Sequence, residues 1–272
     1  MASRLAGKWV IITGASSGFG AAAARAFGAE GARILIGARR VERLRIVAAE
    51  ATKAGAAEVH LHPLDVSKTS SVEEFVAWAK AQIIRNAQSA ITNGPVVDVL
   101  INNAGGALGL DPVAEGKDED WETMMQTNVL GLLRVTRAVL PLMIKNPGSS
   151  ILNVGSYASR AAYEGGGAYC GAKAAELMIS RSLRLELYGT GVRVASIDPG
   201  LANTDFSTVR FKGDVERAKK VYEGTFPLLA EDIAEIMVWV ASRPPHVCID
   251  EMLIKATDQA AMHKVYRRKP NA

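Results

Sequence analysis

The chain has 272 residues, and its composition of 49% hydrophobic and 22% charged residues is that of a globular protein, which excludes a disordered chain. Its net charge of +4 arises from scattered lysines and arginines, and the basic run "YRRK" near the C-terminus lacks the aromatic platforms of a nucleic-acid groove. No apolar run is long enough to span a membrane, no signal peptide is recognisable, and the two cysteines suit a reducing compartment. We therefore expect a cytoplasmic protein that binds neither nucleic acid nor membrane.

Short apolar runs alternate with helical patterns along the chain, and the runs are rich in Val, Ile and Leu, as in strands buried on both faces of a parallel sheet. Strands are expected at 9–14, 32–39, 58–66, 96–105, 149–156, 192–200 and 252–257. Helices are expected at 18–30, 41–54, 70–90, 118–145, 167–188, 214–223 and 231–242. The alternation predicts a doubly wound parallel α/β sheet of about seven strands, Rossmann-type, with helices on both faces and a single domain spanning 1–272.

The first expected strand runs into "TGASSGFG", residues 13–20. Glycines in such a loop permit a tight strand-to-helix turn and let the backbone approach a pyrophosphate at the helix N-terminus, where free N–H groups favour anions. A merely flexible turn is the alternative, but the position between a strand and a helix favours a cofactor site. The loop residues expected to contact a dinucleotide are Gly14, Ser16, Ser17, Gly18, Phe19 and Gly20.

The second expected strand ends in "IGARR", which places Arg39 and Arg40 where a NAD site usually has an acidic residue. A guanidinium group matches a 2′-phosphate with forked donors. The alternative is a solvated helix start, but cations there oppose the helix dipole and need another reason. The sequence therefore predicts NADP(H) rather than NAD(H).

The next two strands end in further candidates for cofactor contact. Asp65 and Val66 follow the third strand, and Asp65 either caps the following turn or contacts the adenine amino group, an alternative that the sequence leaves open. Asn103, Ala104 and Gly105, in "NNAG" after the fourth strand, include small residues that admit a ligand close to the backbone.

A second group of polar residues follows the later strands. Tyr169 and Lys173, in "YCGAK", stand four positions apart and share one face of a helix, a pattern that in isolation is most often coincidence. Ser156 closes the fifth strand. Asn128, in "TNVLG", lies within an expected helix, although asparagine has a low helix propensity. These residues are candidates for catalysis.

Six motifs in register, "TGASSGFG", "NNAG", "TNVLG", "VGS", "YCGAK" and "DPG", resemble the short-chain dehydrogenases/reductases over essentially the whole chain. The resemblance implies an oxidoreductase that interconverts an alcohol with a ketone or aldehyde. It assigns proton exchange with the substrate oxygen to Tyr169, support of the phenolate and of the nicotinamide ribose to Lys173, orientation of the substrate oxygen to Ser156, and a proton-relaying water to Asn128.

The same resemblance extends to the residues after the sixth strand. It implies that Thr204 fixes the nicotinamide carboxamide, with the backbone of Pro199, Gly200 and Leu201 nearby. No metal is expected, because the histidines have no carboxylate or cysteine at ligand spacing.

The C-terminal third carries a narrower resemblance, through "TDFSTVRFKGD", "AEDIAE", "PPHVCID" and "TDQA", to NADP-dependent 3-hydroxy acid dehydrogenases. It implies serine, allo-threonine, 3-hydroxyisobutyrate or 3-hydroxypropionate as substrate, covered by a small segment around 204–226. Arg210 in this segment is expected to hold the substrate carboxylate, with a surface arginine as the equal alternative. Residues 81–97 are expected to form a surface insertion.

Two other functions stay open: a reductase of a bulkier ketone, and a non-catalytic NADPH-binding protein on the same fold. The resemblance also implies a homotetramer. The expected helices 118–145 and 167–188 support that assembly, because they carry more small and apolar residues than one sheet face needs.

Overall fold

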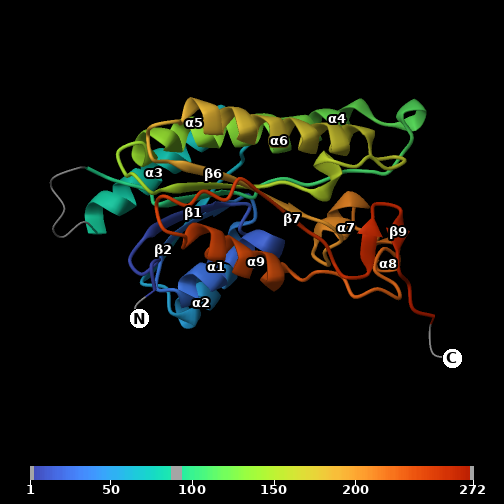
Figure 1. Cartoon of the computed structure of the whole chain (residues 1–272), viewed down its shortest axis with the longest axis horizontal. Helices are drawn as coiled ribbons and strands as arrows, with labels where there is room; N and C mark the ends of the chain where they lie inside the picture. The colour runs from blue at the N-terminus through green and yellow to red at the C-terminus, as the bar shows by residue number, and fades with distance from the viewer. Residues whose placement is uncertain (1–2, 87–93, 270–272) are drawn as a thin grey trace.

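The computed structural model describes residues 3–86 and 94–269, and its centre is one parallel sheet of seven strands in the order β3-β2-β1-β4-β5-β6-β7 (Figure 1). The strands are β1 (Trp9–Thr13), β2 (Arg33–Ala38), β3 (Glu58–Pro63), β4 (Val99–Asn102), β5 (Ser150–Val154), β6 (Arg193–Pro199) and β7 (Glu251–Ile254). The predicted fold class is confirmed. Because β1 and β4 lie side by side, strand order reverses between them, and parallel sheets bind ligands at such a point.

Helices cover both faces of the sheet, which explains why central strands such as β1 and β2 are buried almost throughout. On one face lie α1 (Gly18–Ala29), α2 (Val41–Ala54) and α9 (Ala230–Ala241), and on the other α3 (Thr69–Asn86), α5 (Gly131–Met143) and α6 (Gly167–Glu186) (Figure 1). Successive residues of β1 serve the two faces in turn: Val10 and Ile12 join the core under α1 and α9, whereas Trp9 and Ile11 join the core under α3 and α5. No helix of the described residues is long and apolar enough to cross a membrane.

The predicted helix 118–145 changes its winding at its centre. It consists of α4 (Asp118–Met124), a π-helical segment η2 (Met125–Leu130) and α5. Asn128 lies in the π segment, where its Nδ2 donates to the carbonyl of Met124 at 2.8 Å and so competes with the helical backbone ladder. Such π segments are frequent at functional sites, which agrees with the candidate role of Asn128.

The C-terminal third differs from the predicted elements. The predicted helix 214–223 is present as the shorter α8 (Val215–Lys220), and a further short helix that the sequence did not predict, α7 (Phe206–Arg210), precedes it; Lys212 between them adopts a left-handed φ of 52°. Two strands that the sequence did not predict, β8 (Gln259–Ala261) and β9 (Lys264–Val265), pair in a small antiparallel sheet. These four elements lie together beyond the end of β7 (Figure 1).

The predicted surface insertion at 81–97 is described only in part. Helix α3 is described over Thr69–Asn86, and residues 87–93 of the insertion, with the last part of the helix expected at 70–90, lie outside the described residues.

Candidate active site

The glycine-rich loop between β1 and α1 is built for close backbone approach. Gly14 has a φ of +65°, and a Cβ added there would lie 2.7 Å from the Cα of Ala104. Asn103 braces the loop, because its Nδ2 donates to the carbonyls of Thr13 at 2.9 Å and Gly14 at 3.1 Å. At Gly20 a Cβ would lie 2.8 Å from the carbonyl oxygen of Gly14. The loop after β1 and the end of β4 therefore form one rigid surface at the point where strand order reverses.

The two arginines after β2 occupy different positions. Arg40 reaches back to the glycine-rich loop, with its Nη2 donating to Ser17 Oγ at 2.7 Å and to Ser16 Oγ at 3.2 Å. Arg39 is exposed and lies close enough to Asp65 to act on its carboxyl. One guanidinium and two hydroxyls thus gather at the end of β2, a donor set suited to a phosphate.

Asp65 caps the turn that follows β3, which is one of the two interpretations that the sequence leaves open. Its Oδ1 accepts from Ser67 N at 3.0 Å and from Ser67 Oγ at 2.6 Å. Burial alone would raise the pKa of Asp65, but the Ser67 bonds and the charges of Arg39 and Lys68 hold it below its ordinary value. The side chain of the neighbouring Val66 is buried against Gly131, so only the Val66 backbone is left for a cofactor.

Tyr169 and Lys173 lie one turn apart on α6, and both are buried. Lys173 Nζ donates to the carbonyl of Val154, the last residue of β5, at 2.8 Å. Ser156 follows two residues later and opens a short 3-10 helix, η3 (Tyr157–Ser159), against which α6 packs. The end of β5 therefore brings Ser156, Tyr169 and Lys173 to one edge of the sheet.

Asn128 approaches the same edge from the π segment. Its Nδ2 donates to the carbonyl of Gly106 at 2.9 Å, and its Oδ1 accepts from the Gly106 N–H at 3.1 Å. A Cβ added to Gly105 would lie 2.5 Å from Asn128 Oδ1 and 3.8 Å from Lys173 Nζ. The loop after β4, the π segment and α6 therefore converge around the ammonium of Lys173.

The loop after β6 closes the other side of the predicted cofactor site. Thr204 lies opposite Gly18, since a Cβ on Gly18 would be 3.6 Å from the Thr204 Cβ. The backbone that leads to Thr204 is held by Gln259, whose Oε1 accepts from the Leu201 N–H at 2.7 Å. Pro199 ends β6 and Gly200 continues its pairing through an N–H that donates to the Ile254 carbonyl at 2.7 Å.

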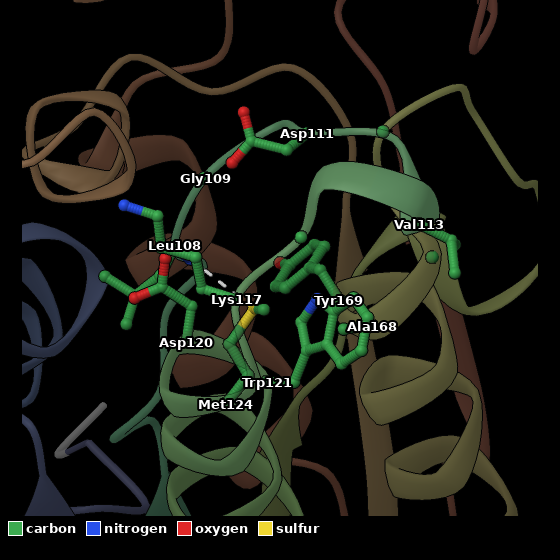
Figure 2. Close-up of a pocket in the computed structure, with 13 residues that line it drawn as sticks. Leu108, Gly109, Asp111, Val113, Lys117, Asp120, Trp121, Met124, Ala168 and Tyr169 are labelled. Carbon is green, nitrogen blue, oxygen red and sulfur yellow. Dashed lines mark hydrogen bonds between the residues drawn. The ribbon is translucent and has the colours of Figure 1, made fainter.

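A pocket opens beside Tyr169, between the loop after β4, α4 and the start of α6. Figure 2 shows the Tyr169 ring next to the Trp121 indole, with Met124 beneath and Val113 at the far side. Asp111 and Asp120 line the same pocket. The Leu108 N–H donates to the sulfur of Met124 at 3.4 Å, the dashed line in Figure 2, and ties the loop to α4. A small molecule in this pocket would touch the catalytic candidate directly.

Arg210 lies against the aromatic side chains around Tyr169. Its guanidinium carbon is 5.1 Å from the centre of the Tyr169 ring and 4.9 Å from that of Phe206, and its Nη2 donates to the hydroxyl of Tyr163 at 2.5 Å. Burial raises the pKa of Tyr163 to about 12, so this hydroxyl is a neutral acceptor. The Nε of Arg210 is buried and has no hydrogen-bond partner among the described residues. A donor of this kind is suited to an acidic ligand.

Several residues of this site escaped sequence reasoning. Tyr163 and Glu176 lie outside the recognised motifs, and Gln259 lies within "TDQA" without having been assigned a role; the relevance of all three follows only from contacts made across the fold. Tyr222 is a further example: its hydroxyl donates to the Ala202 carbonyl at 3.0 Å and thereby anchors the segment after Thr204. Among the residues that the structure describes, no group of three or more His, Cys, Asp or Glu is placed to hold a metal ion.

A parallel sheet in this order, with a glycine-rich turn leading from β1 into α1, is the Rossmann-type dinucleotide-binding fold. Within this class, the family model "short chain dehydrogenase" matches residues 8–214, and the chain belongs to that family.

Curated relatives match over nearly their whole length. The NADP-dependent 3-hydroxy acid dehydrogenase of Salmonella typhi is 42% identical over 260 residues, covering 95% of this chain and 99% of the relative. The serine 3-dehydrogenase of Agrobacterium fabrum is 39% identical, with 95% and 98% covered. Among solved structures, the closed form of serine dehydrogenase complexed with NADP⁺ has a TM-score of 0.83 and 38% identity, with 96% of this chain and 100% of that chain covered.

Proposed function

We propose that this protein is an NADP-dependent oxidoreductase that interconverts the hydroxyl-bearing carbon of small 3-hydroxy acids, of the serine, allo-threonine, 3-hydroxyisobutyrate or 3-hydroxypropionate type, with the corresponding carbonyl. The observation that carries the substrate class is Arg210, whose guanidinium lies against the Tyr169 ring with a buried, unpaired Nε. The relatives named as 3-hydroxy acid and serine dehydrogenases support the same choice.

The residues at the strand ends fit NADP. Side chains at Gly14 and Gly20 would fill the cradle over the end of β4, and Arg40, Ser16 and Ser17, which gather at the end of β2, would hold the 2′-phosphate of the cofactor. When bound, the nicotinamide supplies the hydride acceptor. In this proposal Thr204 and the Leu201 backbone hold the carboxamide end, and Lys173 holds the ribose next to it.

The protein's own residues then handle the proton. Tyr169 Oη takes the proton of the substrate hydroxyl during oxidation and returns it during reduction, while Ser156 Oγ holds the same substrate oxygen. Lys173, buried beside Tyr169, supplies the positive charge that favours the ionised tyrosine. Asn128, held by Gly106 and Met124, orients a water between the ammonium and solvent.

The segment around 204–226 covers the substrate in this account, within a single catalytic domain spanning 1–272. Three contacts tie it to the pocket: Arg210 to Tyr163, the Arg210 carbonyl to the Gly109 N–H at 3.0 Å, and Lys212 to Asp120 at 2.8 Å. In a 3-hydroxy acid one carbon separates the carboxylate from the reacting carbon, and Arg210, whose guanidinium carbon is 5.1 Å from the centre of the Tyr169 ring, would pair with that carboxylate when the hydroxyl is at Tyr169.

A substrate panel tests the proposal. NADP⁺ reduction is followed at 340 nm with serine, allo-threonine, 3-hydroxyisobutyrate and 3-hydroxypropionate, and with the matched methyl esters. We expect turnover on the acids to exceed turnover on the esters. Preference for neutral or bulky alcohols would establish the ketone-reductase alternative, and NADPH binding without turnover of any alcohol would establish the non-catalytic one.

Cofactor choice gives a second expected result. Replacing Arg39 and Arg40 together with alanine should lower kcat/KM for NADP⁺ by at least about 10- to 150-fold relative to NAD⁺, because the loss of one charge-assisted phosphate contact costs about 1.5–3 kcal/mol. The ratio of kcat/KM values for the two cofactors is measured in wild type and variant. Arg45→Ala, on the exposed surface of α2, is the matched control. An unchanged ratio in the double variant would refute the phosphate role.

We also propose a cytoplasmic homotetramer. The supporting observation is a group of exposed apolar side chains on the π segment, α5 and α6, which lie side by side on one face of the sheet (Figure 1). The group consists of Met125, Leu130, Leu133, Met178 and Leu185. Light scattering at micromolar concentration should give about four times the 28.9 kDa mass of the chain. A monomer alone at that concentration would contradict the assembly.

A further inference from the structure

Glu176 is a buried carboxylate that the reaction, as derived so far, does not use. It lies one turn beyond Lys173 on α6 and is only 2% exposed. Its Oε2 accepts a hydrogen bond from Lys173 Nζ at 2.7 Å, in an ion pair of which both members are buried. Taking a carboxylate out of water costs several kcal/mol unless its partners compensate, so a carboxylate at this depth needs a reason.

Two of the three N–H donors of the Lys173 ammonium are used in hydrogen bonds within the protein. One goes to the carbonyl of Val154 at the end of β5 and one to Glu176, which lie at 2.8 and 2.7 Å. The third makes no bond to any residue in the described ranges. Gly105 is close to this ammonium, since a Cβ added there would lie 3.8 Å from Lys173 Nζ. Glu176 and Val154 thus act as two fixed points that orient the remaining donor.

The charges around this pair come from few residues. Tyr169 acts on Lys173 from the same helix, and Asp198, at the end of β6, acts on both members of the pair. Asp198 already has its own partners: its Oδ2 accepts from Arg160 Nη2 at 2.6 Å, and its Oδ1 accepts from Ser196 Oγ at 2.6 Å. The π segment contributes only the neutral Asn128. Glu176 is therefore the main counter-charge of Lys173.

Burial acts against both charges. For Lys173, burial alone would lower the pKa, but the Glu176 carboxylate, followed by Tyr169, raises it above its ordinary value. For Glu176, burial raises the pKa to about 7, against the lowering effect of Lys173. Above that pH the carboxylate is ionised and holds the ammonium in its charged form.

We propose that Glu176 is a positioning residue, which keeps Lys173 protonated inside the protein and directs its remaining N–H toward the ribose of the cofactor. The inference rests on the proposed role of Lys173 in cofactor binding and does not depend on which alcohol the enzyme oxidises. In this proposal the positive charge of Lys173 beside Tyr169 depends on the Glu176 carboxylate.

The test measures NADPH affinity by fluorescence titration from about pH 7 to about pH 10, in wild type, Glu176→Gln and Glu176→Asp. Gln keeps the shape and an acceptor oxygen but removes the charge. In Glu176→Gln, Lys173 should lose its proton as the pH rises, and the NADPH Kd should increase at least tenfold across the range, since one pKa unit corresponds to a tenfold change. Wild type and Glu176→Asp, which retain a carboxylate, should change less than about threefold on the same scale.

A double variant separates positioning from mere structural support. If Glu176 acts through Lys173, then Glu176→Gln should add no pH dependence to Lys173→Met. If the NADPH Kd of Glu176→Gln changed with pH no more than that of wild type, the inference would be overturned, even if that variant were less stable.

A measurement on wild type covers the case in which the variants fail to fold. The ¹³Cε resonance of Lys173, assigned by eliminating those of the other lysines, should keep the ammonium position beyond pH 10.5. Deprotonation below the ordinary lysine value would also overturn the inference. Both readouts are independent of turnover, so a failure of the 3-hydroxy acid assignment would leave them interpretable.

Discussion

Replacing Tyr169 with phenylalanine is expected to lower kcat by about 10²- to 10⁴-fold, the usual contribution of a positioned acid–base group, while NADPH binding stays within a few-fold of wild type. Phenylalanine keeps the ring, and with it the contacts to Phe206 at 5.5 Å and Arg210 at 5.1 Å between centres. Only the hydroxyl that we propose to exchange a proton with the substrate is lost. The site should therefore keep its shape and lose its chemistry.

Steady-state rates with NADP⁺, together with NADPH fluorescence titrations, measure the two effects separately. Tyr188→Phe is the matched control. Tyr188 is 91% exposed just beyond the end of α6, so this substitution removes the same hydroxyl group outside the site. If Tyr169→Phe kept most of its activity, the proton would be handled by another group and the proposed mechanism would be wrong.

Replacing Arg210 with alanine is expected to lower kcat/KM on 3-hydroxy acids by about 10- to 150-fold, with a smaller loss on their methyl esters. A partly desolvated pairing of a guanidinium with a carboxylate contributes about 1.5–3 kcal/mol, and esters cannot form it. The buried Nε without a partner is the group that the carboxylate would satisfy. Arginine suits this position because its planar fork pairs both carboxylate oxygens.

The measurement compares kcat/KM for each acid and its ester in wild type and Arg210→Ala. Arg217→Ala is the control: Arg217 is exposed on α8 in the same covering segment, with its guanidinium 4.3 Å from the Phe211 ring centre. Equal losses on acids and esters would mean that Arg210 shapes the covering segment through Tyr163 and Phe206 and does not read the carboxylate.

The sheet and its strand-end motifs could be predicted because their signals are local. Buried parallel strands appear as short runs of Val, Ile and Leu, and a glycine loop such as that at Gly14 needs its special backbone conformation whatever surrounds it. The start of α4 at Asp118 could be predicted for the same reason, because carboxylates in the first turn of a helix complement its dipole.

Features that depend on distant contacts could not be predicted in the same way. Glu176 shares the buried face of α6 with Tyr169 and Lys173, but a glutamate is ordinarily exposed, and its burial follows from how α6 packs against the sheet and from the bond to Lys173. Strands β8 and β9 have three and two residues, too short for any periodicity to indicate them. In the π segment the Asn128 side chain donates to the carbonyl of Met124, and the local sequence pattern indicates only a continuous helix there.

The central claim is that the chain oxidises the hydroxyl carbon of a 3-hydroxy acid with NADP⁺, and isotope transfer tests it most directly. The enzyme is incubated with NADP⁺ and 3-hydroxypropionate deuterated at carbon 3, and the reduced cofactor is examined by mass spectrometry and NMR. The account predicts NADPH that carries deuterium at nicotinamide C4, together with the 3-oxo acid. Absence of labelled NADPH, in an enzyme preparation that binds NADPH and oxidises the methyl ester or a neutral alcohol, would contradict it.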